Sequence, residues 1–502
     1  MNHYFLGIDV STTASKALVI DQEGHVVASH SKEYALKTPY PLWAEQNPDD
    51  WWEATSHSIQ QVLKKVSPES IASIGLTGQM HGLVSLDKKG KPLRPAILWN
   101  DQRSNAECEE ITEQLGSDFL IKHIGSILLP CFITPKLLWL KKQEPDVYDA
   151  ISHILLPKDY VRFCLSGEYA TDVSDASGLG LLDIEKRIWS TALLSILKIP
   201  HSWLPRLFES QEISATVSAA AAKKTGLKVG TPIAAGAGDQ PAQSIGNGII
   251  ESGLVSLAVG TSGVTFSIAD KYHPDLQGRV NTFCHAIPNK WFHMGVTMSA
   301  AGSLRWLRDT LAPTSSYASL DQKAVTISRG SNGLLFAPYL SGERHPHSDA
   351  FARATWVGLT LNHQLAHMIR SVLEGVAFSL RDNIELFRIL GIHPESVIMS
   401  GGGANSELWS MIIAEVMGLP LYTLHSNEGA ALGAAILAAV GVKAWPDVPS
   451  ACCDLIKKNK EILPDPLAVT TYDQIYKIYR ELYPNLSKTF HHLTEFDAMK
   501  FH

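Results

Sequence analysis

The chain contains two copies of one short pattern, Val10-Ser-Thr-Thr-Ala14 and Val259-Gly-Thr-Ser-Gly263, each between two apolar runs of strand length. One copy therefore stands near the start of each half of the chain. A repeated unit of strand, small hydroxyl-bearing turn and strand indicates a two-lobed duplication. The alternative is a pair of unrelated hairpins, because Gly, Ser and Thr are common in turns.

The residues of these turns are suited to binding phosphate. Small residues let several backbone N–H groups approach an anion, and the hydroxyls of Ser11, Thr12, Thr13 and Thr261 add donors. No G-x-x-x-x-G-K-[ST] sequence and no G-x-G-x-x-G after a strand is present, so the two turns are the candidates for holding a polyphosphate. Only the first turn follows an acid, Asp9, which makes Asp9 the predicted Mg²⁺ ligand.

A third glycine-rich turn, Ser400-Gly-Gly-Gly-Ala-Asn405, follows the apolar run 397–399 and precedes an amphipathic helical pattern. A turn of this kind at a helix N-terminus lets an anion, or the edge of a ribose or adenine, lie against bare backbone. The alternative is a tight strand-to-helix turn that needs glycine only for packing.

Asp239 is the acid that we single out. It follows a strand-like run and a glycine turn and precedes a helix of small residues. A carboxylate at such a strand end faces the cleft of an open α/β sheet, which suits a general base. The alternative is an Asp that only caps the following helix.

The composition supports a large α/β protein with a small-molecule substrate. The 502 residues are 45% hydrophobic, enough for two domains with complete cores, and apolar β-branched runs alternate with longer helical patterns. The net charge of −7 is scattered along the chain, which argues against nucleic acid or an anionic membrane as partner. The apolar stretch 430–442 is too short to cross a bilayer and is predicted to be a buried helix.

The start of the chain shows no basic leader, and the six cysteines form no Cys-x-x-Cys pair. We therefore expect reduced thiols and a cytoplasmic location. A homodimer is compatible with the sequence.

Nine segments together resemble the FGGY carbohydrate kinases in order and spacing over residues 4–442. They are Gly7-Ile-Asp-Val10, Trp43-Ala-Glu-Gln-Asn-Pro-Asp-Asp-Trp-Trp52, Gly75-Leu-Thr-Gly-Gln-Met-His-Gly82, Leu98-Trp-Asn-Asp-Gln-Arg103, Leu156-Pro-Lys-Asp-Tyr160, Gly238-Asp-Gln240, Val259-Gly-Thr-Ser-Gly263, Tyr339-Leu-Ser-Gly-Glu-Arg344 and Ser400-Gly-Gly-Gly-Ala404. The element Gly-Gln-Met-His-Gly looks like the substrate loop of the xylulose kinases in this family, where glycerol kinases carry an Arg-Glu pair.

The resemblance implies an α/β fold of two ribonuclease-H-like (actin-like ATPase) domains, 1–245 and 246–502, that flank a catalytic cleft. It implies ATP and Mg²⁺ as cofactors and a pentulose substrate, most closely D-xylulose, converted to its 5-phosphate. The alternatives are another ketose or polyol, such as ribulose or ribitol, and a non-catalytic actin-like ATP-binding protein.

The resemblance also implies a role for each matching residue. Asp9 would help to hold Mg²⁺, Asp239 would be the general base, and the sugar would contact Met80, His81, Asp239 and Gln240. The transferred phosphate would lie near Ser11, Thr12, Thr13 and Thr261, and the adenosine would lie along Gly401, Gly402 and Asn405. Trp99, Asp101 and Arg103 border the family's site, but a structural role fits them equally well, and Trp306 is a weaker candidate on the nucleotide side.

Two positions depart from the family pattern. Ser11 stands where a glycine is usual, so either Ser11 tolerates a glycine-like conformation or the turn differs. Gln240 replaces the Asn of many xylulose kinases, and the longer amide can shift the preference among sugars. We expect the hinge between the domains at Gly236–Gly253, where glycines cluster.

Overall fold

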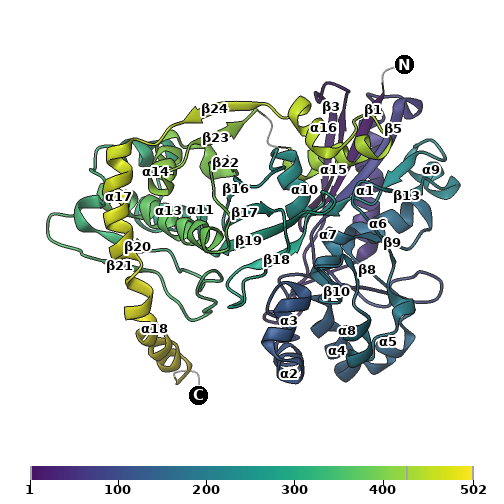
Figure 1. The fold of residues 1–502 in the computed structure, drawn as a ribbon, viewed down its shortest axis with the longest axis horizontal. Coiled ribbons are helices and arrows are strands. Elements are labelled where there is room, and N and C mark those ends of the chain that lie inside the picture. The colour runs from purple at the N-terminus through teal and green to yellow at the C-terminus, as the bar shows by residue number, and fades with distance from the viewer. Residues whose placement is uncertain (1–2, 426–427, 500–502) are drawn as a thin grey trace.

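The computed structural model describes residues 3–425 and 428–499 and contains two large mixed sheets of seven strands each. Figure 1 shows most of the first half of the chain, in purple to teal, on the right and most of the second half, in teal to yellow, on the left, whereas α15 (Gly429–Gly441) and α16 (Val448–Leu455) lie beside the purple strands of the first half. The first sheet has the order β13-β14-β5-β1-β2-β3, with β15 also on β5, and the second has the order β18-β19-β17-β16-β22-β23-β24.

The strands of the first sheet are β1 (Tyr4–Val10), β2 (Ala14–Ile20), β3 (Val26–Glu33), β5 (Ile71–Gly78), β13 (Ile213–Thr216), β14 (Pro232–Ala234) and β15 (Ala237–Gly238). Those of the second are β16 (Leu254–Val259), β17 (Gly263–Ala269), β18 (Asn281–Cys284), β19 (Trp291–Thr297), β22 (Ser396–Ser400), β23 (Leu421–Leu424) and β24 (Lys458–Ile462). Five two-stranded pairs complete the β-structure: β4 (Glu45–Gln46) with β7 (Ala96–Ile97), β6 (Val84–Leu86) with β8 (His153–Leu155), β9 (Ala170–Asp172) with β12 (Arg206–Phe208), β10 (Leu182–Asp183) with β11 (Ile188–Trp189), and β20 (Leu335–Ala337) with β21 (Thr355–Val357).

The two sheets share one topology. In the first, the run β3-β2-β1 is antiparallel and β1 continues parallel to β5; in the second, β19-β17-β16 is antiparallel and β16 continues parallel to β22. Both short patterns singled out in the sequence form the turn between the first two strands of their sheet. The duplication is therefore confirmed by the strand order, and the two hairpins are equivalent rather than unrelated.

Helices cover both sheets. In the first half they are α1 (Pro48–Val62), α2 (Asn105–Leu115), α3 (Ser117–Ile124), α4 (Ile133–Gln143), α5 (Pro145–Ala150), α6 (Pro157–Ser166), α7 (Val173–Ala176), α8 (Thr191–Leu197), α9 (Ala219–Thr225) and α10 (Asp239–Gly246). In the second half they are α11 (Ala301–Leu311), α12 (Tyr317–Ala324), α13 (Leu365–Ile389), α14 (Glu407–Met417), α15 (Gly429–Gly441), α16 (Val448–Leu455), α17 (Pro466–Tyr479) and α18 (Leu482–Met499).

The helices α10 and α15 join the two halves (Figure 1). A Cβ added to Gly433 of α15 would lie 1.9 Å from the carbonyl oxygen of Ala242 in α10, so the two helix backbones touch. A Cβ on Gly7 of β1 or Gly75 of β5 would meet a carbonyl oxygen of α15 at 2.0 and 1.9 Å. Because only glycine permits such approach, α15 lies directly on the first sheet although it belongs to the second half of the chain. The predicted buried helix is thus confirmed.

The C-terminal tail packs on the second half. Tyr472, Tyr476 and Tyr479 of α17 are buried in the same apolar core as α13 and α14. All six cysteines are free thiols. Among residues 3–425 and 428–499, no helix combines the length and the apolar character needed to cross a bilayer.

Candidate active site

Three parallel strand ends bring together the predicted metal ligand, Asp9, and the predicted general base, Asp239. The register of β1, β5 and β15 sets Asp9, Thr77 and Ala237 in one row across the first sheet. Asp239 follows two residues after Ala237, as the first residue of α10, and its Oδ1 accepts a hydrogen bond from the backbone N–H of Gln240 at 2.8 Å. Since residues 68 and 230 positions apart meet at this edge, strand pairing rather than local sequence builds the site.

Both acids hold their protons more tightly than usual. Burial, and then the charge of Asp239, raise the pKa of Asp9 to about 7, although Lys16 on β2 lowers it. Burial raises the pKa of Asp239 to about 6 against the opposing hydrogen bonds from Gln240 and its own backbone. The Oδ1 atom of Asp9 is buried and has no hydrogen-bond partner. A buried, unpartnered carboxylate oxygen beside a second acid is a site that a cation would stabilise.

The turn 11–13, which was predicted to bind phosphate, is held by several hydrogen bonds. Ser11 Oγ donates to the carbonyl of Ala14 at 2.9 Å, and none of residues 10–14 has a positive φ. The Ser at the family's glycine position is therefore accommodated without strain. The Thr12 hydroxyl accepts from Trp99 Nε1 at 3.0 Å and donates to Gln79 Oε1 at 3.2 Å. Gln79, which the sequence did not single out, and Trp99 therefore both hold the turn by hydrogen bonds to Thr12.

The predicted sugar loop lies against the turn that carries Asp239. A Cβ on Gly238 would come within 2.8 Å of the Met80 side chain, so Met80 packs on the residue before Asp239. His81 has a φ of 68° and is buried, and its Nδ1 donates to the carbonyl of Gly178 at 2.9 Å. Burial lowers the pKa of His81 to about 3, so the ring is neutral and its Nε2 carries a free lone pair.

A fully buried network of charged side chains holds the turn that precedes Asp239. Lys158 Nζ in α6 lies 2.6 Å from Asp159, 2.9 Å from Asp172 and 3.3 Å from Asp175. Ser174 Oγ donates to Asp172 and accepts from the backbone N–H of Gly238 at 3.2 Å. The network therefore anchors the turn that carries Asp239.

Asp101 and Arg103 have a structural role. The Arg103 guanidinium forms two hydrogen bonds with Asp101, at 2.9 and 2.7 Å, and lies over the Trp43 ring at 3.6 Å. The Asp101 carboxylate also accepts from the backbone N–H of Ala44 at 2.6 Å. Of the two readings that the sequence left open for this pair, these contacts favour the structural one.

The second-half residues form their own group. Strand β16 lies beside β22, so the turn 260–262 adjoins the glycine turn 401–405. A Cβ on Gly401 or Gly403 would lie within 2.8 Å of Val259, which explains the need for glycine there. A hollow of about 450 Å³ opens beside them, lined by Ala301, Leu304, Tyr317, Ala318, Asp321, Gly402, Gly403, Asn405, Ser406 and Trp409. Trp306 does not line it and packs on Trp356 at 5.7 Å.

The structure therefore brings the predicted residues together in two groups. The first contains Asp9, Ser11, Thr12, Thr13, Met80, His81, Asp239 and Gln240, and the second contains Thr261, Gly401, Gly402 and Asn405. No hydrogen bond or ion pair between described residues joins one group to the other. Tyr317 and Asp321 of the hollow were missed by the sequence reasoning, because nothing in their local sequence marks them.

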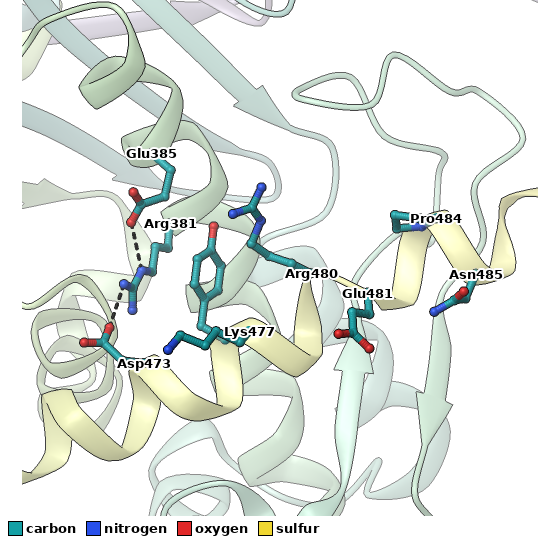
Figure 2. A pocket seen from close by; sticks show the side chains of 9 residues that line it. Arg381, Glu385, Asp473, Lys477, Arg480, Glu481, Pro484 and Asn485 are labelled. Carbon is teal, nitrogen blue, oxygen red and sulfur yellow. Dashed lines mark hydrogen bonds and ion pairs between the residues drawn. The ribbon is translucent and has the colours of Figure 1, made fainter.

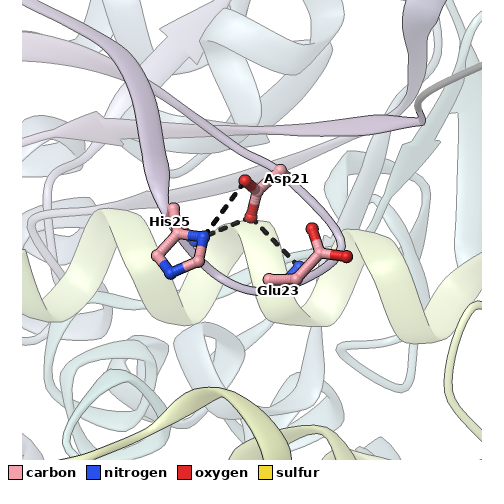
Figure 3. A group of neighbouring side chains, drawn as sticks. All are labelled: Asp21, Glu23 and His25. Atoms are coloured by element: carbon pink, nitrogen blue, oxygen red, sulfur yellow. Dashed lines mark hydrogen bonds and ion pairs between the residues drawn. The ribbon is translucent and has the colours of Figure 1, made fainter.

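Three side chains of the kinds that can bind a metal ion, Asp21, Glu23 and His25, lie together on the exposed turn between β2 and β3 (Figure 3). Asp21 Oδ1 accepts from the backbone N–H groups of Glu23 at 3.0 Å and His25 at 2.7 Å. These bonds are those of an ordinary turn with an Asp at its first position. The turn itself accounts for the clustering.

Comparisons with known proteins agree with this architecture. The model of the FGGY family of carbohydrate kinases, N-terminal domain, matches residues 4–246, and that of the C-terminal domain matches residues 255–442. Xylulose kinase of Escherichia coli is 36% identical over 483 residues, 96% of this chain and 99% of that protein.

Two solved structures share the fold over nearly the whole chain. Xylulose kinase from Rhodospirillum rubrum superimposes with a TM-score of 0.92 at 30% identity, covering 97% of this chain and 100% of that one. Gluconate kinase from Lactobacillus acidophilus superimposes with a TM-score of 0.94 at 29% identity, covering 98% of this chain and 100% of that one. The two lobes are therefore of the predicted actin-like type, and this chain belongs to the FGGY family of carbohydrate kinases.

Proposed function

We propose that this protein transfers the γ-phosphoryl group of ATP to the 5-hydroxyl of D-xylulose. The observation that carries the proposal is the packing of the Met80–His81 loop on Gly238, directly before the acid Asp239. The full-length similarity to xylulose kinase of E. coli supports the choice of sugar.

Asp239 is the general base of the proposed reaction. Its carboxylate takes the proton of the sugar hydroxyl, the sugar oxygen forms the new bond to the γ-phosphorus, and the bond to the bridging oxygen breaks to leave ADP. A pKa of about 6 leaves Asp239 largely ionised at pH 7 to 8 while keeping it basic enough to accept a proton. Positioning and charge stabilisation supply the rest of the catalysis.

Asp9 is the proposed Mg²⁺ ligand. Its buried, unpartnered Oδ1 and raised pKa fit a cation, and the equivalent position in the second half is Ala258. Held by Asp9, Mg²⁺ would supply positive charge to neutralise the phosphates. The backbone and hydroxyl donors of Ser11, Thr12 and Thr13 would lie near the transferred phosphoryl group, and Thr261 would approach the phosphates from the second half.

The sugar and the nucleoside bind at separate places in this proposal. Neutral His81 keeps its Nδ1–H on Gly178, so its Nε2 accepts a hydrogen bond from a sugar hydroxyl. Gln240, partly accessible at the start of α10, is a further sugar contact. The hollow beside Gly401, Gly402 and Asn405 receives the adenosine. The domains 1–245 and 246–502 close over the sugar and the nucleotide, and this closure excludes water from the reacting phosphate.

A panel of substrates in a coupled ADP-release assay tests the proposal. It contains D-xylulose, D-ribulose, ribitol, gluconate and glycerol at saturating MgATP. We expect D-xylulose to give the highest kcat/KM. A higher value for D-ribulose, ribitol or gluconate would reassign the substrate, and ADP release that no sugar stimulates would point to a non-catalytic ATP-binding protein.

A further inference from the structure

The segment Tyr339-Leu-Ser-Gly-Glu-Arg344 has no role in the reaction as derived so far. It follows β20 in the second half of the chain and ends at Arg344, which stands between Glu343 and His345. Glu343 and His345 are buried, whereas Arg344 is partly accessible.

The backbone at Arg344 is fixed to the end of β19. Glu343 accepts hydrogen bonds from the Thr297 hydroxyl at 2.7 Å and from the backbone N–H of Met298 at 2.9 Å. His345 pairs with Val296 in both directions, at 3.1 Å through its backbone N–H and at 2.9 Å through its ring Nδ1. Because both neighbours are held by hydrogen bonds, the backbone that carries the Arg344 side chain is fixed in place.

The side chain of Arg344 crosses to the first half of the chain. Its Nη2 lies 3.9 Å from the sulfur of Cys131. Lys136 Nζ donates to the carbonyls of both Cys131, at 2.8 Å, and His81, at 2.7 Å, and the Phe132 ring packs edge-on against His81 at 5.2 Å. The guanidinium group therefore lies beside the segment Cys131–Phe132, which contacts His81 of the sugar loop.

The charge of Arg344 is not used within the protein. No carboxylate oxygen lies within 4.0 Å of its guanidinium group among residues 3–425 and 428–499. A partly buried guanidinium has five N–H donors to satisfy, and here a single thiol is the one side-chain acceptor that the structure provides. The remaining guanidinium nitrogens are accessible, so the oxygen atoms of a ligand can serve as their acceptors.

We propose that Arg344 binds the sugar from the opposite lobe, donating hydrogen bonds to the oxygens at the C1–C2 end of the pentulose. This inference rests on the proposed function, in which the 5-hydroxyl faces Asp239. A line of contacts then leads away from that carboxylate, from Gly238 to Met80, on to His81, and past Phe132 and Cys131 to Arg344. The end of the sugar opposite O5 meets Arg344, so that sugar binding draws the lobes together.

The test uses the full-length enzyme with Arg344→Met and Arg344→Lys. Arg480→Met is the matched control, because Arg480 also lacks a carboxylate within 4.0 Å among the described residues but lies beside a hollow of about 880 Å³ between α13 and α17 (Figure 2). D-xylulose is compared with 1-deoxy-D-xylulose, which lacks the C1 hydroxyl. Steady-state constants for sugar and MgATP are measured together with the melting temperature.

For D-xylulose, Arg344→Met is expected to lower kcat/KM by about 10- to 100-fold, mainly through the sugar KM, as for a lost charge-assisted hydrogen bond. The KM for MgATP should stay within about twofold, and the loss should shrink to about threefold or less with 1-deoxy-D-xylulose. Arg344→Lys should recover part of the loss, and Arg480→Met should match wild type.

Other results would overturn the inference. An Arg344→Met enzyme with wild-type constants would remove Arg344 from the sugar site. An equal loss of kcat/KM with both sugars, or a raised KM for MgATP, would place the guanidinium on the phosphates instead. If Arg344→Met does not fold, a soluble Arg344→Lys enzyme with an unchanged ratio between the two sugars refutes the C1 contact. Absence of sugar-dependent ADP release in wild type contradicts the proposed function itself.

Discussion

Replacing Asp239 by Asn should separate the catalytic role of this side chain from its role in the fold. Asn keeps the shape and can still accept the hydrogen bond from Gln240, but it cannot take the proton of the sugar hydroxyl. We expect kcat to fall by about 10² to 10⁴, the usual contribution of a general base, while equilibrium sugar binding largely survives.

The same change should stabilise the protein at neutral pH. The pKa of Asp239 is raised in the folded state, from 3.8 to about 6, mainly by burial. Its stabilising contribution is therefore fully present below pH 3.8, in the protonated form, and is lost as the pH rises through 6. At 1.36 kcal/mol per pH unit, the ionised carboxylate costs the fold about 3 kcal/mol at pH 8, as an order of magnitude.

The assay therefore measures three quantities in one preparation: kcat, sugar binding by calorimetry and the free energy of unfolding at several pH values. Asp239→Asn should exceed wild type in stability by up to about 3 kcal/mol at pH 8, and the difference should narrow as the pH falls towards 4. The matched control is Asp146→Asn, because Asp146 is also in the first turn of a helix, α5, but is exposed.

A folded Asp239→Asn protein that binds sugar and turns over near the wild-type rate would remove Asp239 from the mechanism, and Asp9 would be the next base to test. A stability difference independent of pH would refute the raised pKa. An effect as small as that of Asp146→Asn on all three quantities would leave Asp239 as a simple first-turn acid.

Four further predictions address the rest of the site and its scaffold. His81→Ala should raise the sugar KM far more than the MgATP KM, and equal effects on both would contradict its place on the sugar. Gln240→Asn should shift the preference towards D-xylulose over other ketoses by about 1 kcal/mol, roughly fivefold, which the substrate panel measures. Asp9→Asn should raise the Mg²⁺ concentration for half-maximal activity about tenfold or more without changing the sugar KM, and an unchanged Mg²⁺ titration would remove Asp9 as the ligand. Gly433→Ala should lower the free energy of unfolding by about 3 kcal/mol or more, since its Cβ would lie 1.9 Å from a carbonyl oxygen, whereas Gly402→Ala, with nothing within 4 Å of its Cβ, should leave stability unchanged.

The local elements were predictable because their signals are local. The apolar run before the second turn pattern was expected to be a strand and is β16, and the apolar stretch 430–442 is the buried helix α15. Helix starts were less accurate. For α1, three polar residues, Asn47, Asp49 and Asp50, stand close together, and it is Asn47 that accepts from the backbone N–H of Asp49, while Pro48 begins the helix. Polar residues in succession offer several caps, and only the backbone angles decide among them.

The site was predictable as a set of residues but not as an arrangement. The hairpin at Ser11–Thr13 and the acid Asp239 carry recognisable local patterns, whereas the row that joins Asp9, Thr77 and Ala237 depends on parallel pairing between distant strands. Arg344 shows the same limit. Its sequence neighbours indicate a family motif, yet its position beside Cys131 follows from the packing of two lobes.

The packing of α10 on α15 narrows where the lobes can move. The sequence predicts a hinge over Gly236–Gly253, but the first part of this range is β15 and α10, and a Cβ on Gly246 would lie 2.0 Å from the carbonyl of Gly429. Separating these helices would open a gap across a close-packed interface. A rotation that preserves them has to use the connection 247–253 before β16, where Gly248 and Gly253 have φ values of 72° and 95°. Such φ values are accessible to glycine at little cost, so this connection can change shape while the Asp9–Asp239 edge stays intact.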